Sequence, residues 1–428
     1  MFERETKCVQ SGYNPKSGEP RVLPIYQSTT FSYDSPEDMA ALFDLKAEGF
    51  FYSRLGNPTV DALEKKIADL DGGVAAMGTA SGMSATLITV ANLCHAGDNI
   101  ISTATVYGGT YNLFSTTIAK LGIECRFVDP CVSREELEYK IDDRTKLFFC
   151  ETIANCAMNV ANFEMFSDVC KKYGVVFAVD NTLATPVICR PIEHGVNVVV
   201  YASTKYLDGH ATSVGGIIVD GGNFNFLGNK RYPDFNEPDE SYHGLVYAKD
   251  CGKVGFIVKA RAQYMRDFGA QMAPMNAFLT FLGSETLHLR MPRHSENALL
   301  VAEMLKKHPN VEWVKYCGLK DDPNYPLVQK YFDNGMASGM VTFGIKGGRA
   351  GAIRFQKALK LFRIVTHIAD ARSCVLHPAS TTHRQLSDSD LKACGISDNL
   401  IRLSVGIENA KDILADLENA LSEAAKGN

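Results

Sequence analysis

The chain has 428 residues, of which 46% are hydrophobic and 22% are charged, so it is long enough for more than one hydrophobic core. Its formal net charge of -5 argues against nucleic acid as the main partner. No apolar run is long enough to span a bilayer, and the charged N-terminus lacks the apolar segment of a secretory signal. We therefore expect a globular, cytoplasmic protein that binds neither nucleic acid nor a membrane.

The twelve cysteines are scattered from Cys8 to Cys394 and include no C-x-x-C pair. Several stand in apolar surroundings, as Cys150 does in LFFCE, which favours small buried side chains in a reducing compartment over disulfides. The ten histidines show no H-E-x-x-H or similar spacing of ligands. We therefore expect no metal site.

Residues 1–59 are irregular and rich in Pro, Ser, Thr and Tyr, with one helical stretch over residues 35–49. A segment of this kind cannot bury a core by itself. We predict that it forms an N-terminal arm, which packs on another part of the assembly.

Helix-like and strand-like segments alternate between residues 60 and 216. Helical periodicity over residues 59–73 ends at a pair of glycines, and an amphipathic helix over 163–174 separates two β-rich runs. The β-rich runs are apolar on nearly every residue, as expected of strands that are covered on both faces. The pattern predicts an α/β domain with a mostly parallel sheet. Its predicted strands are residues 98–107, 146–152, 175–182 and 197–204.

The alternation stops at residues 221–253, which are polar, aromatic and rich in turn formers, and which we interpret as an insertion. A helical region follows over residues 256–308, with an expected interruption at Met291–Pro292. The remaining strands and helices are typical of a smaller α+β domain. We predict three parts: an arm at 1–59, a ligand-binding α/β domain at 60–283 and a C-terminal α+β domain at 284–428.

Polar side chains stand where the predicted strands end, and the binding crevice of an open α/β sheet lies at the carboxyl ends of its strands. A lone strand-end carboxylate is usually a cap, and a lone lysine usually lies on the surface. Four such endings on one edge of a sheet favour a site instead. They are Tyr107-Gly108-Gly109, Glu151 with Asn155, Asp180-Asn181-Thr182 and Ser203-Thr204-Lys205.

A fifth element adds a candidate anion site. The stretch GTASGMSATLITVANL begins with small residues and continues as a helix, so backbone N–H groups around Ser81, Gly82 and Met83 could hold a phosphate at the positive end of the helix. Taken alone, an ordinary serine cap is the simpler interpretation. The stretch is neither a P-loop nor a G-x-G-x-x-G motif, which argues against a nucleotide or dinucleotide.

A lysine amine, a carboxylate, an aromatic ring and a phosphate site together fit one cofactor, pyridoxal 5'-phosphate. In this interpretation Lys205 forms the Schiff base, with its amine pKa lowered by burial. Asp180 keeps the ring nitrogen protonated, and Tyr107 stacks on the face of the ring.

Motifs along nearly the whole chain resemble the Cys/Met-metabolism family of pyridoxal-phosphate enzymes. The resemblance implies a fold-type I pyridoxal-phosphate transferase, and residues 233–247, 257–279, 283–298 and 377–386 are most similar to the O-acetylhomoserine sulfhydrylases within that family. The motifs that carry it are FFYSRLGNPTVDALEKKIADLDGG, ASGMSA, VYGGTYNLF, AVDNTLATP, STKYLDGHATSVGGIIVDGG, HPASTTHRQL and IRLSVGIEN.

The resemblance also implies roles for single residues. Lys205 and Tyr107 move protons while Asp180 pairs with the ring nitrogen, and Arg402 binds the substrate carboxylate, a task that suits a bidentate guanidinium. Tyr52 and Arg54 are similar to a pair that reaches the phosphate of a neighbouring subunit. The remaining expected cofactor contacts are Asn155 at the ring hydroxyl, Thr182 at the ring face, and Ser81, Gly82, Met83, Ser203 and Thr204 around the phosphate.

The implied reaction is γ-replacement on O-acetyl-L-homoserine by sulfide or methanethiol, which gives homocysteine or methionine and acetate. The implied assembly is a homo-oligomer, a dimer of active-site dimers. Two alternatives stay open: a γ-lyase or cystathionine-forming enzyme with the same site, and a cofactor-binding protein whose catalysis has degraded. The sulfur donor and the acyl leaving group are also open.

Some positions depart from the family pattern. Ala202 and Cys156 stand where serine and proline are common in the family. Gly109 replaces a cysteine of the methionine γ-lyases, which argues against that activity. His367 and Ala369 occupy positions where sulfhydrylases more often have asparagine and glycine, so the carboxylate side of the pocket is expected to differ.

Overall fold

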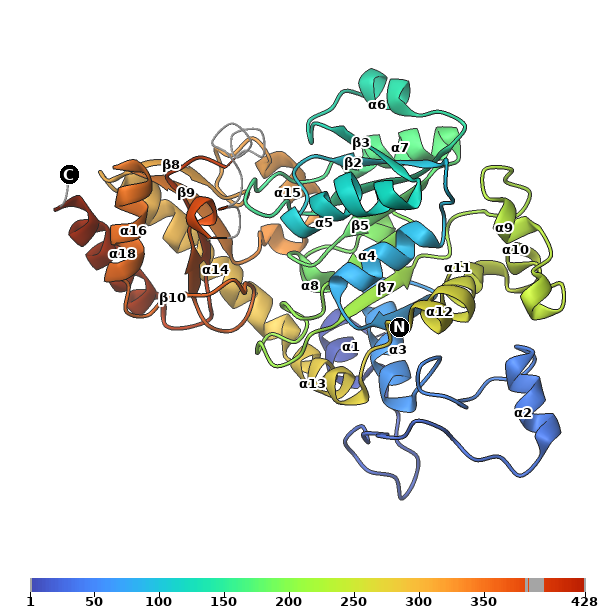
Figure 1. The fold of residues 1–428 in the computed structure, drawn as a ribbon. Coiled ribbons are helices and arrows are strands. Elements are labelled where there is room, and N and C mark those ends of the chain that lie inside the picture. Colours follow the sequence, from blue (N-terminus) through green and yellow to red (C-terminus); the bar gives the residue numbers. More distant parts are fainter. Residues whose placement is uncertain (1, 382–383, 385–395, 427–428) are drawn as a thin grey trace.

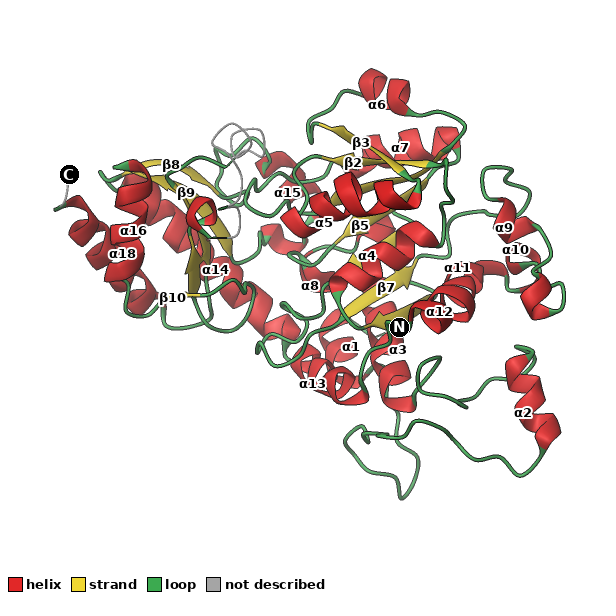
Figure 2. Ribbon diagram, in the orientation of Figure 1, coloured by secondary structure: helices red, strands yellow, loops and turns green. Residues whose placement is uncertain are grey.

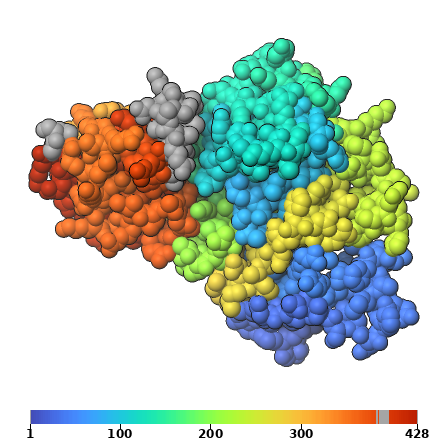
Figure 3. Space-filling view, in the orientation of Figure 1, coloured from blue at the N-terminus to red at the C-terminus, as the bar shows by residue number. Residues whose placement is uncertain are grey.

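The computed structural model describes residues 2–381, 384 and 396–426 (Figure 1). The 377–386 motif is therefore described only in part, because its residues 382, 383, 385 and 386 lie outside the described residues. The chain forms an α/β body and a C-terminal lobe with a sheet of its own. Figure 3 shows this lobe, orange to red, on one side of the body, and the first residues, blue, on another.

The large sheet has seven strands in the order β1-β7-β6-β5-β4-β2-β3. β2, β3, β4, β5 and β6 run parallel, whereas β7 is antiparallel to both of its neighbours. The prediction of a mostly parallel sheet is therefore confirmed. The strands are β1 (Ala75–Thr79), β2 (Asn99–Thr103), β3 (Glu124–Val128), β4 (Thr145–Glu151), β5 (Val176–Asp180), β6 (Val198–Tyr201) and β7 (Gly216–Asp220).

Both faces of this sheet are covered by helices (Figure 2). Successive residues of one strand point to opposite faces, and Phe148 and Phe149 of β4 accordingly belong to two different buried apolar clusters. This explains why the middle residues of the central strands are all apolar. The helices of the body are α3 (Pro58–Asp71), α4 (Gly82–Ala91), α5 (Gly108–Asn112), α6 (Arg134–Lys140), α7 (Phe163–Tyr173) and α8 (Thr185–Ile188).

Local chemistry starts these helices where the sequence indicates. Asn57 caps α3 by accepting a hydrogen bond from the N–H of Thr59, and Pro58 occupies the first helical position. The Asn162 side chain caps α7 in the same way. The apolar side of α3 includes Leu63 and Ile67, which are fully buried.

Residues 221–253 contain two four-residue helices, α9 (Pro233–Asn236) and α10 (Tyr247–Asp250), with turns between them. The following helical region is α11 (Gly255–Lys259), α12 (Arg266–Phe268), α13 (Pro274–Glu285) and α14 (Leu287–Lys307). The expected interruption at Met291–Pro292 was wrong, since α14 runs through Pro292 and the chain turns at Thr286 instead. Pro292 lies near the start of the helix and forfeits a single backbone hydrogen bond there.

The C-terminal lobe has a five-stranded sheet in the order β10-β11-β12-β9-β8. The predicted boundary between 283 and 284 falls inside α13, and the division into three parts stays a prediction. The elements of the lobe are β8 (Val311–Lys315), α15 (Tyr325–Tyr331), β9 (Met340–Ile345), α16 (Gly348–Ala358), β10 (Arg363–Ile364), β11 (Cys374–Leu376), β12 (Leu400–Ser404) and α18 (Ala410–Ala425).

The N-terminal segment contains α1 (Arg4–Gln10) and α2 (Pro36–Phe43). The helix α1 packs on the body through the fully buried Cys8, whereas α2 lies on a loop that extends away from it (Figure 1). No helix of the described residues is long and apolar enough to cross a membrane. The eleven cysteines within these residues are all free.

Candidate active site

The predicted strand-end residues gather because β4, β5 and β6 are parallel neighbours. Glu151, the last residue of β4, is paired in register with Asp180, the last residue of β5. Asp180 is in turn paired with Val200 of β6, one residue before that strand ends. The segment that carries Lys205 therefore leaves the sheet at the same edge as the two carboxylates.

Glu151 is buried, and Asp180 is half-buried beside it. Burial is the main cause that raises the pKa of Glu151 to about 8, and the nearby charge of Asp180 is the second cause of the same shift. Burial also raises the pKa of Asp180, although Oδ1 accepts a hydrogen bond of 2.9 Å from the N–H of Thr182, which opposes the shift. Two adjacent carboxyl groups with raised pKa values favour a cation beside them.

Glu151 also holds two loops of the site in place. Its Oε1 accepts a hydrogen bond of 2.6 Å from the N–H of Tyr107, and its Oε2 accepts one of 2.9 Å from the N–H of Asn155. Sequence reasoning placed Glu151 at a strand end but gave it no role. Its partners are backbone groups that a sequence motif does not reveal.

The Tyr107 ring is 49% exposed and lies over Gly109. A Cβ added at Gly109 would come within 2.5 Å of Tyr107 Cε1, so a side chain at this position would displace the ring. Glycine here keeps Tyr107 in an open position above the strand ends, where it is available for stacking.

Lys205 follows β6 in a tight turn, in which its N–H donates to the carbonyl of Ala202 and its carbonyl accepts from the N–H of Gly209. Burial lowers the pKa of the Lys205 ammonium, and the charge of Arg402 adds to this effect. A lysine with a depressed pKa has more free amine at neutral pH, which is the form that attacks an aldehyde. Its Nζ lies 3.5 Å from His367 Nδ1.

The start of α4 faces the end of β6. Ser81 caps this helix, since its Oγ accepts a hydrogen bond of 3.1 Å from the N–H of Ser84. The N–H groups of Gly82 and Met83 precede the first intrahelical bonds and point out of the helix end. A Cβ added at Gly82 would meet Ala202 Cβ at 2.7 Å, so glycine allows the helix end and the strand end to approach this closely.

The hydroxyl residues around this helix end have different surroundings. Thr182 Oγ1 accepts a hydrogen bond of 2.8 Å from the N–H of Ala202. Thr204 Oγ1 is bound to the backbone of Gly215. The Ser203 Oγ is buried beside Gly215 and has no hydrogen-bond partner among the described residues, so its contacts give no support to the predicted phosphate contact.

Arg402 lies on β12 in the C-terminal lobe and is 6% exposed. Its Nη1 donates to Asn155 Oδ1 and its Nη2 to the carbonyl of Thr366, both at a long 3.4 Å, while its buried Nε has no partner within the described residues. A buried guanidinium with donors to spare suits a carboxylate ligand. The contact with Asn155 shows that the candidate site lies between the body and the lobe.

Cys156 stands beside Arg402, and burial raises the pKa of its thiol while Arg402 opposes that shift. Its φ of 69° lies in the left-handed region, and its carbonyl accepts a hydrogen bond of 3.0 Å from Thr342 Oγ1 on β9. Proline cannot adopt this φ. The departure from the proline that is common here is therefore accompanied by a different backbone conformation.

Within the described residues, Tyr52 and Arg54 form no hydrogen bond or ion pair with Lys205 or with the strand-end carboxylates. Tyr52 is 39% exposed, and the Arg54 guanidinium lies 5.2 Å from the centre of its ring. Arg54 Nη1 also donates to the carbonyl of Arg266. Within one chain Tyr52 is therefore exposed, whereas Arg54 is half-buried.

These residues fit pyridoxal 5'-phosphate. The carboxyl pair of Glu151 and Asp180 suits a protonated ring nitrogen, and the amine of Lys205 suits the aldehyde. The free end of α4 suits the phosphate. Asn155 would lie where the lobe and the body meet around the ring.

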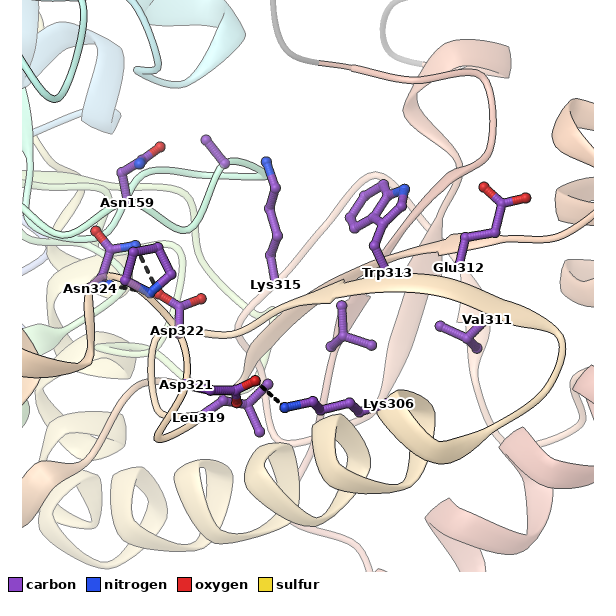
Figure 4. A pocket seen from close by; sticks show the side chains of 13 residues that line it. Asn159, Lys306, Val311, Glu312, Trp313, Lys315, Leu319, Asp321, Asp322 and Asn324 are labelled. Atoms are coloured by element: carbon purple, nitrogen blue, oxygen red, sulfur yellow. Dashed lines mark hydrogen bonds and ion pairs between the residues drawn. The ribbon is translucent and has the colours of Figure 1, made fainter.

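A separate cavity of about 470 Å³ lies between β8 and residues 157–159 (Figure 4). Within it Lys306 forms an ion pair with Asp321, and the Asn324 side-chain amide donates a hydrogen bond to Asp322. It holds none of the predicted site residues. The candidate active site is therefore elsewhere, at the strand ends.

Known proteins resemble the chain over its whole length. The chain is 44% identical to an O-acetyl-L-homoserine sulfhydrylase of Leptospira meyeri, with 98% of this chain and 97% of that protein covered. It is 42% identical to a homocysteine synthase of Schizosaccharomyces pombe, with 98% of each chain covered. A solved Campylobacter jejuni structure, assigned as an O-acetylhomoserine (thiol)-lyase, has a TM-score of 0.95 and 38% identity, covering 98% of this chain and 100% of that one.

The Campylobacter structure carries an N'-pyridoxyl-lysine-5'-monophosphate at its position 205, and position 205 of this chain is a lysine as well. A model of one enzyme family matches residues 5–422. The fold and the cofactor predicted from the sequence are thereby confirmed. The chain belongs to the family of Cys/Met metabolism PLP-dependent enzymes.

Proposed function

We propose that this protein is an O-acetylhomoserine sulfhydrylase, which replaces the γ-acetoxy group of O-acetyl-L-homoserine by sulfide and releases homocysteine and acetate. The observation that carries the proposal is the buried Arg402, whose Nε has no hydrogen-bond partner among the described residues, close to Asn155 and across from Lys205. This arrangement provides an anchor for an amino-acid carboxylate beside an amine that can move a proton. The names of the similar sulfhydrylases and synthase support the same substrate.

The residues of the chain divide the work. Arg402 binds the substrate carboxylate with its guanidinium fork and thereby sets the Cα–H bond toward Lys205. Lys205 takes the Cα proton with its free amine and returns it at the end of the reaction. When bound, pyridoxal phosphate supplies an electron sink for the charge that develops at Cα. Asp180 stabilises positive charge at the ring nitrogen, and Glu151 fixes Tyr107 and Asn155 on either side.

The N-terminus of α4 would hold the phosphate through Gly82 and Met83, with Ser81 and Thr204 next to it. Thr182 would contact the ring face. Tyr52 and Arg54 would complete the phosphate site of a neighbouring subunit, which agrees with the exposed Tyr52 and the half-buried Arg54 of a single chain. We therefore propose a homo-oligomer, a tetramer built as a dimer of active-site dimers. The free cysteines of the described residues support a cytoplasmic location.

A γ-lyase is the second candidate, and the Tyr107 environment argues against it. The methionine γ-lyases that the sequence resembles carry a cysteine at position 109, whereas a side chain there would meet the Tyr107 ring at 2.5 Å. A cystathionine-forming enzyme would use the same Lys205, Asp180 and Arg402, so only its choice of nucleophile differs.

A product assay separates these activities. Purified holoenzyme is given O-acetyl-L-homoserine with sulfide, methanethiol, cysteine or no nucleophile, and in parallel O-succinyl-L-homoserine with sulfide. We expect homocysteine and acetate in equal amounts with sulfide, and little 2-oxo acid or ammonia without a nucleophile. Faster formation of cystathionine, or 2-oxo acid as the main product in the presence of sulfide, would contradict the proposal.

A further inference from the structure

Four buried polar side chains form a connected group at the strand ends, next to the candidate site. Thr152 follows β4 directly, Asn181 follows β5 directly, and Tyr201 is the last residue of β6. The fourth, Asp71, is the last residue of α3. None of the four is more than 1% exposed. The group therefore lies against the ends of all three strands that lead into the carboxylates and the lysine of the site.

The four side chains are joined by a single series of hydrogen bonds. Thr152 Oγ1 donates to Asn181 Oδ1 at 2.7 Å, and Asn181 Nδ2 donates to the hydroxyl of Tyr201 at 2.9 Å. The Tyr201 hydroxyl in turn donates to Asp71 Oδ2 at 2.8 Å. Asn181 Nδ2 also donates to the carbonyl of Cys189 at 2.9 Å. Because a carbonyl can only accept, this last bond fixes the orientation of the Asn181 amide and with it the direction of the series.

The same residues fix the backbone beside the groups that react. The N–H of Thr152 donates to the carbonyl of Asp180 at 3.0 Å, and the N–H of Asn181 donates at 3.0 Å to a carbonyl of β6. Lys205 stands four residues after Tyr201, at the end of the tight turn that follows β6. The side-chain group and these backbone bonds therefore set the position of the lysine relative to the carboxylate of Asp180.

The hydroxyl of Tyr201 is the central member of this group, because it is the one atom that both accepts and donates within it. Without it, one N–H of the Asn181 amide loses its acceptor. The Asp71 carboxylate, whose Oδ1 already has no partner among the described residues, loses its hydrogen bond as well. Two buried polar groups without partners are costly, so the strand ends are expected to shift until both groups find new ones.

We propose that Tyr201 is a positioning residue of this enzyme, whose buried hydroxyl holds Lys205 in place relative to Asp180. The proposal rests on the proposed function, in which Lys205 takes the Cα proton while Asp180 stabilises positive charge at the ring nitrogen. A small displacement of either group slows the proton transfer and weakens the hold on the cofactor. Substrate affinity depends on Arg402 of the C-terminal lobe instead, and it is expected to stay nearly unchanged.

Hydrogen exchange at Cα tests the position of the lysine without a leaving group or a nucleophile. Holoenzyme is incubated with L-norvaline in deuterated water, and deuterium at Cα is followed by proton NMR. Tyr201→Phe keeps the ring and removes only the hydroxyl. We expect its Cα exchange to fall by about 10-fold, and its kcat with O-acetylhomoserine and sulfide to fall similarly, while the KM for O-acetylhomoserine stays within about 3-fold.

Tyr232→Phe is the matched control. Tyr232 is 2% exposed, and its hydroxyl also joins β4 to β5, but at their other ends. It accepts from the N–H of Val176 at 2.8 Å and donates to the carbonyl of Lys146 at 2.5 Å. The control variant therefore removes an equally buried hydroxyl from the same sheet, and its Cα exchange should stay within about 3-fold of the wild type.

A second measurement needs no turnover. The loss of pyridoxal phosphate from each holoenzyme is followed over time by ultrafiltration and the absorbance that stays with the protein. We expect release to be about 5-fold faster or more in Tyr201→Phe and unchanged in Tyr232→Phe. Asp71→Asn keeps an oxygen that accepts from Tyr201, and it should stay within about 3-fold of the wild type in both measurements. Asp71→Ala removes that oxygen and should behave as Tyr201→Phe does.

Three results would overturn the proposal. The first is wild-type exchange and cofactor release in Tyr201→Phe. The second is an equal loss in Tyr232→Phe, which would trace the effect to the general stability of the sheet. The third is equal behaviour of Asp71→Asn and Asp71→Ala. A wild type that exchanges the Cα proton of L-norvaline but makes no homocysteine would refute only the proposed function.

Discussion

Glu151 and Asp180 lie side by side at the ends of β4 and β5, paired in register, and burial raises the pKa of both carboxyl groups. In the cofactor-free protein, the carboxyl groups of Glu151 and Asp180 lie next to each other without the positive charge of the ring nitrogen beside them. A protonated ring nitrogen next to Asp180 supplies that positive charge when the cofactor binds. The pair is therefore costly to ionise until the site is filled.

The first prediction concerns the cofactor-free protein and its stability against pH. The pKa of Glu151 rises from 4.5 to about 8 on folding, so the folded state binds the proton more tightly than the unfolded state. Its contribution is fully present below pH 4.5 and is lost as the pH rises toward 8. Between pH 6 and pH 8.5 we expect the free energy of unfolding in urea to fall, and Glu151→Gln to reduce that fall by about 1–2 kcal/mol.

Asp71 and Asp220 also have pKa values raised to about 7 by burial, so part of the decline will remain in the variant. Glu124→Gln, at an exposed position on β3, is the control and should leave the pH dependence unchanged. A Glu151→Gln protein with the same decline as the wild type would show that Glu151 is ionised already at pH 6.

The second prediction concerns the substrate carboxylate. Arg402→Lys keeps the positive charge but loses the planar fork that binds two oxygens. We expect the KM for O-acetylhomoserine to rise by about 10-fold to 100-fold, with a smaller change in the KM for sulfide. Steady-state kinetics with each substrate varied in turn measures the two values. The control Arg363→Lys, at an exposed site on β10, should behave as the wild type. An unchanged KM for O-acetylhomoserine in Arg402→Lys would show that Arg402 does not bind the substrate carboxylate.

The third prediction concerns the backbone at Cys156. The φ of Cys156 is 69°, which proline cannot adopt and glycine adopts readily. Proline at this position would therefore force the loop that carries Asn155 into a different conformation. We expect Cys156→Pro to lose at least about 10-fold in kcat/KM and Cys156→Gly to stay within about 3-fold of the wild type. Equal activity of the two variants would mean that this loop tolerates either conformation during turnover.

Much of the fold could be predicted from the sequence because the parallel strands must be apolar on both faces. The apolar runs around Phe148 and Val199 can therefore be recognised as buried strands, and glycines and asparagines mark the helix ends. The path of α14 could not be predicted, since Pro292 near a helix start is compatible with either a break or a continuous helix. Burial of the surrounding residues, which the sequence does not display, favours continuity.

The candidate site divides in the same way. Lys205 and Asp180 can be found from the sequence because each stands at or shortly after the carboxyl end of a predicted strand. Parallel neighbouring strands end at the same edge of the sheet. Glu151 could be located but not assigned, since it acts on the N–H groups of Tyr107 and Asn155. His367 stood out only as an unusual residue, because its distance from Lys205 depends on how the lobe packs on the body.

The attachment of the cofactor to Lys205 is the claim on which the whole account depends. The holoenzyme is reduced with borohydride, digested and mapped by mass spectrometry, so that the lysine joined to the cofactor is identified. The account predicts a pyridoxyl phosphate on Lys205 alone, and none after Lys205→Arg, which keeps the charge but cannot form the bond. A label on another buried lysine, such as Lys66 or Lys259, would contradict it.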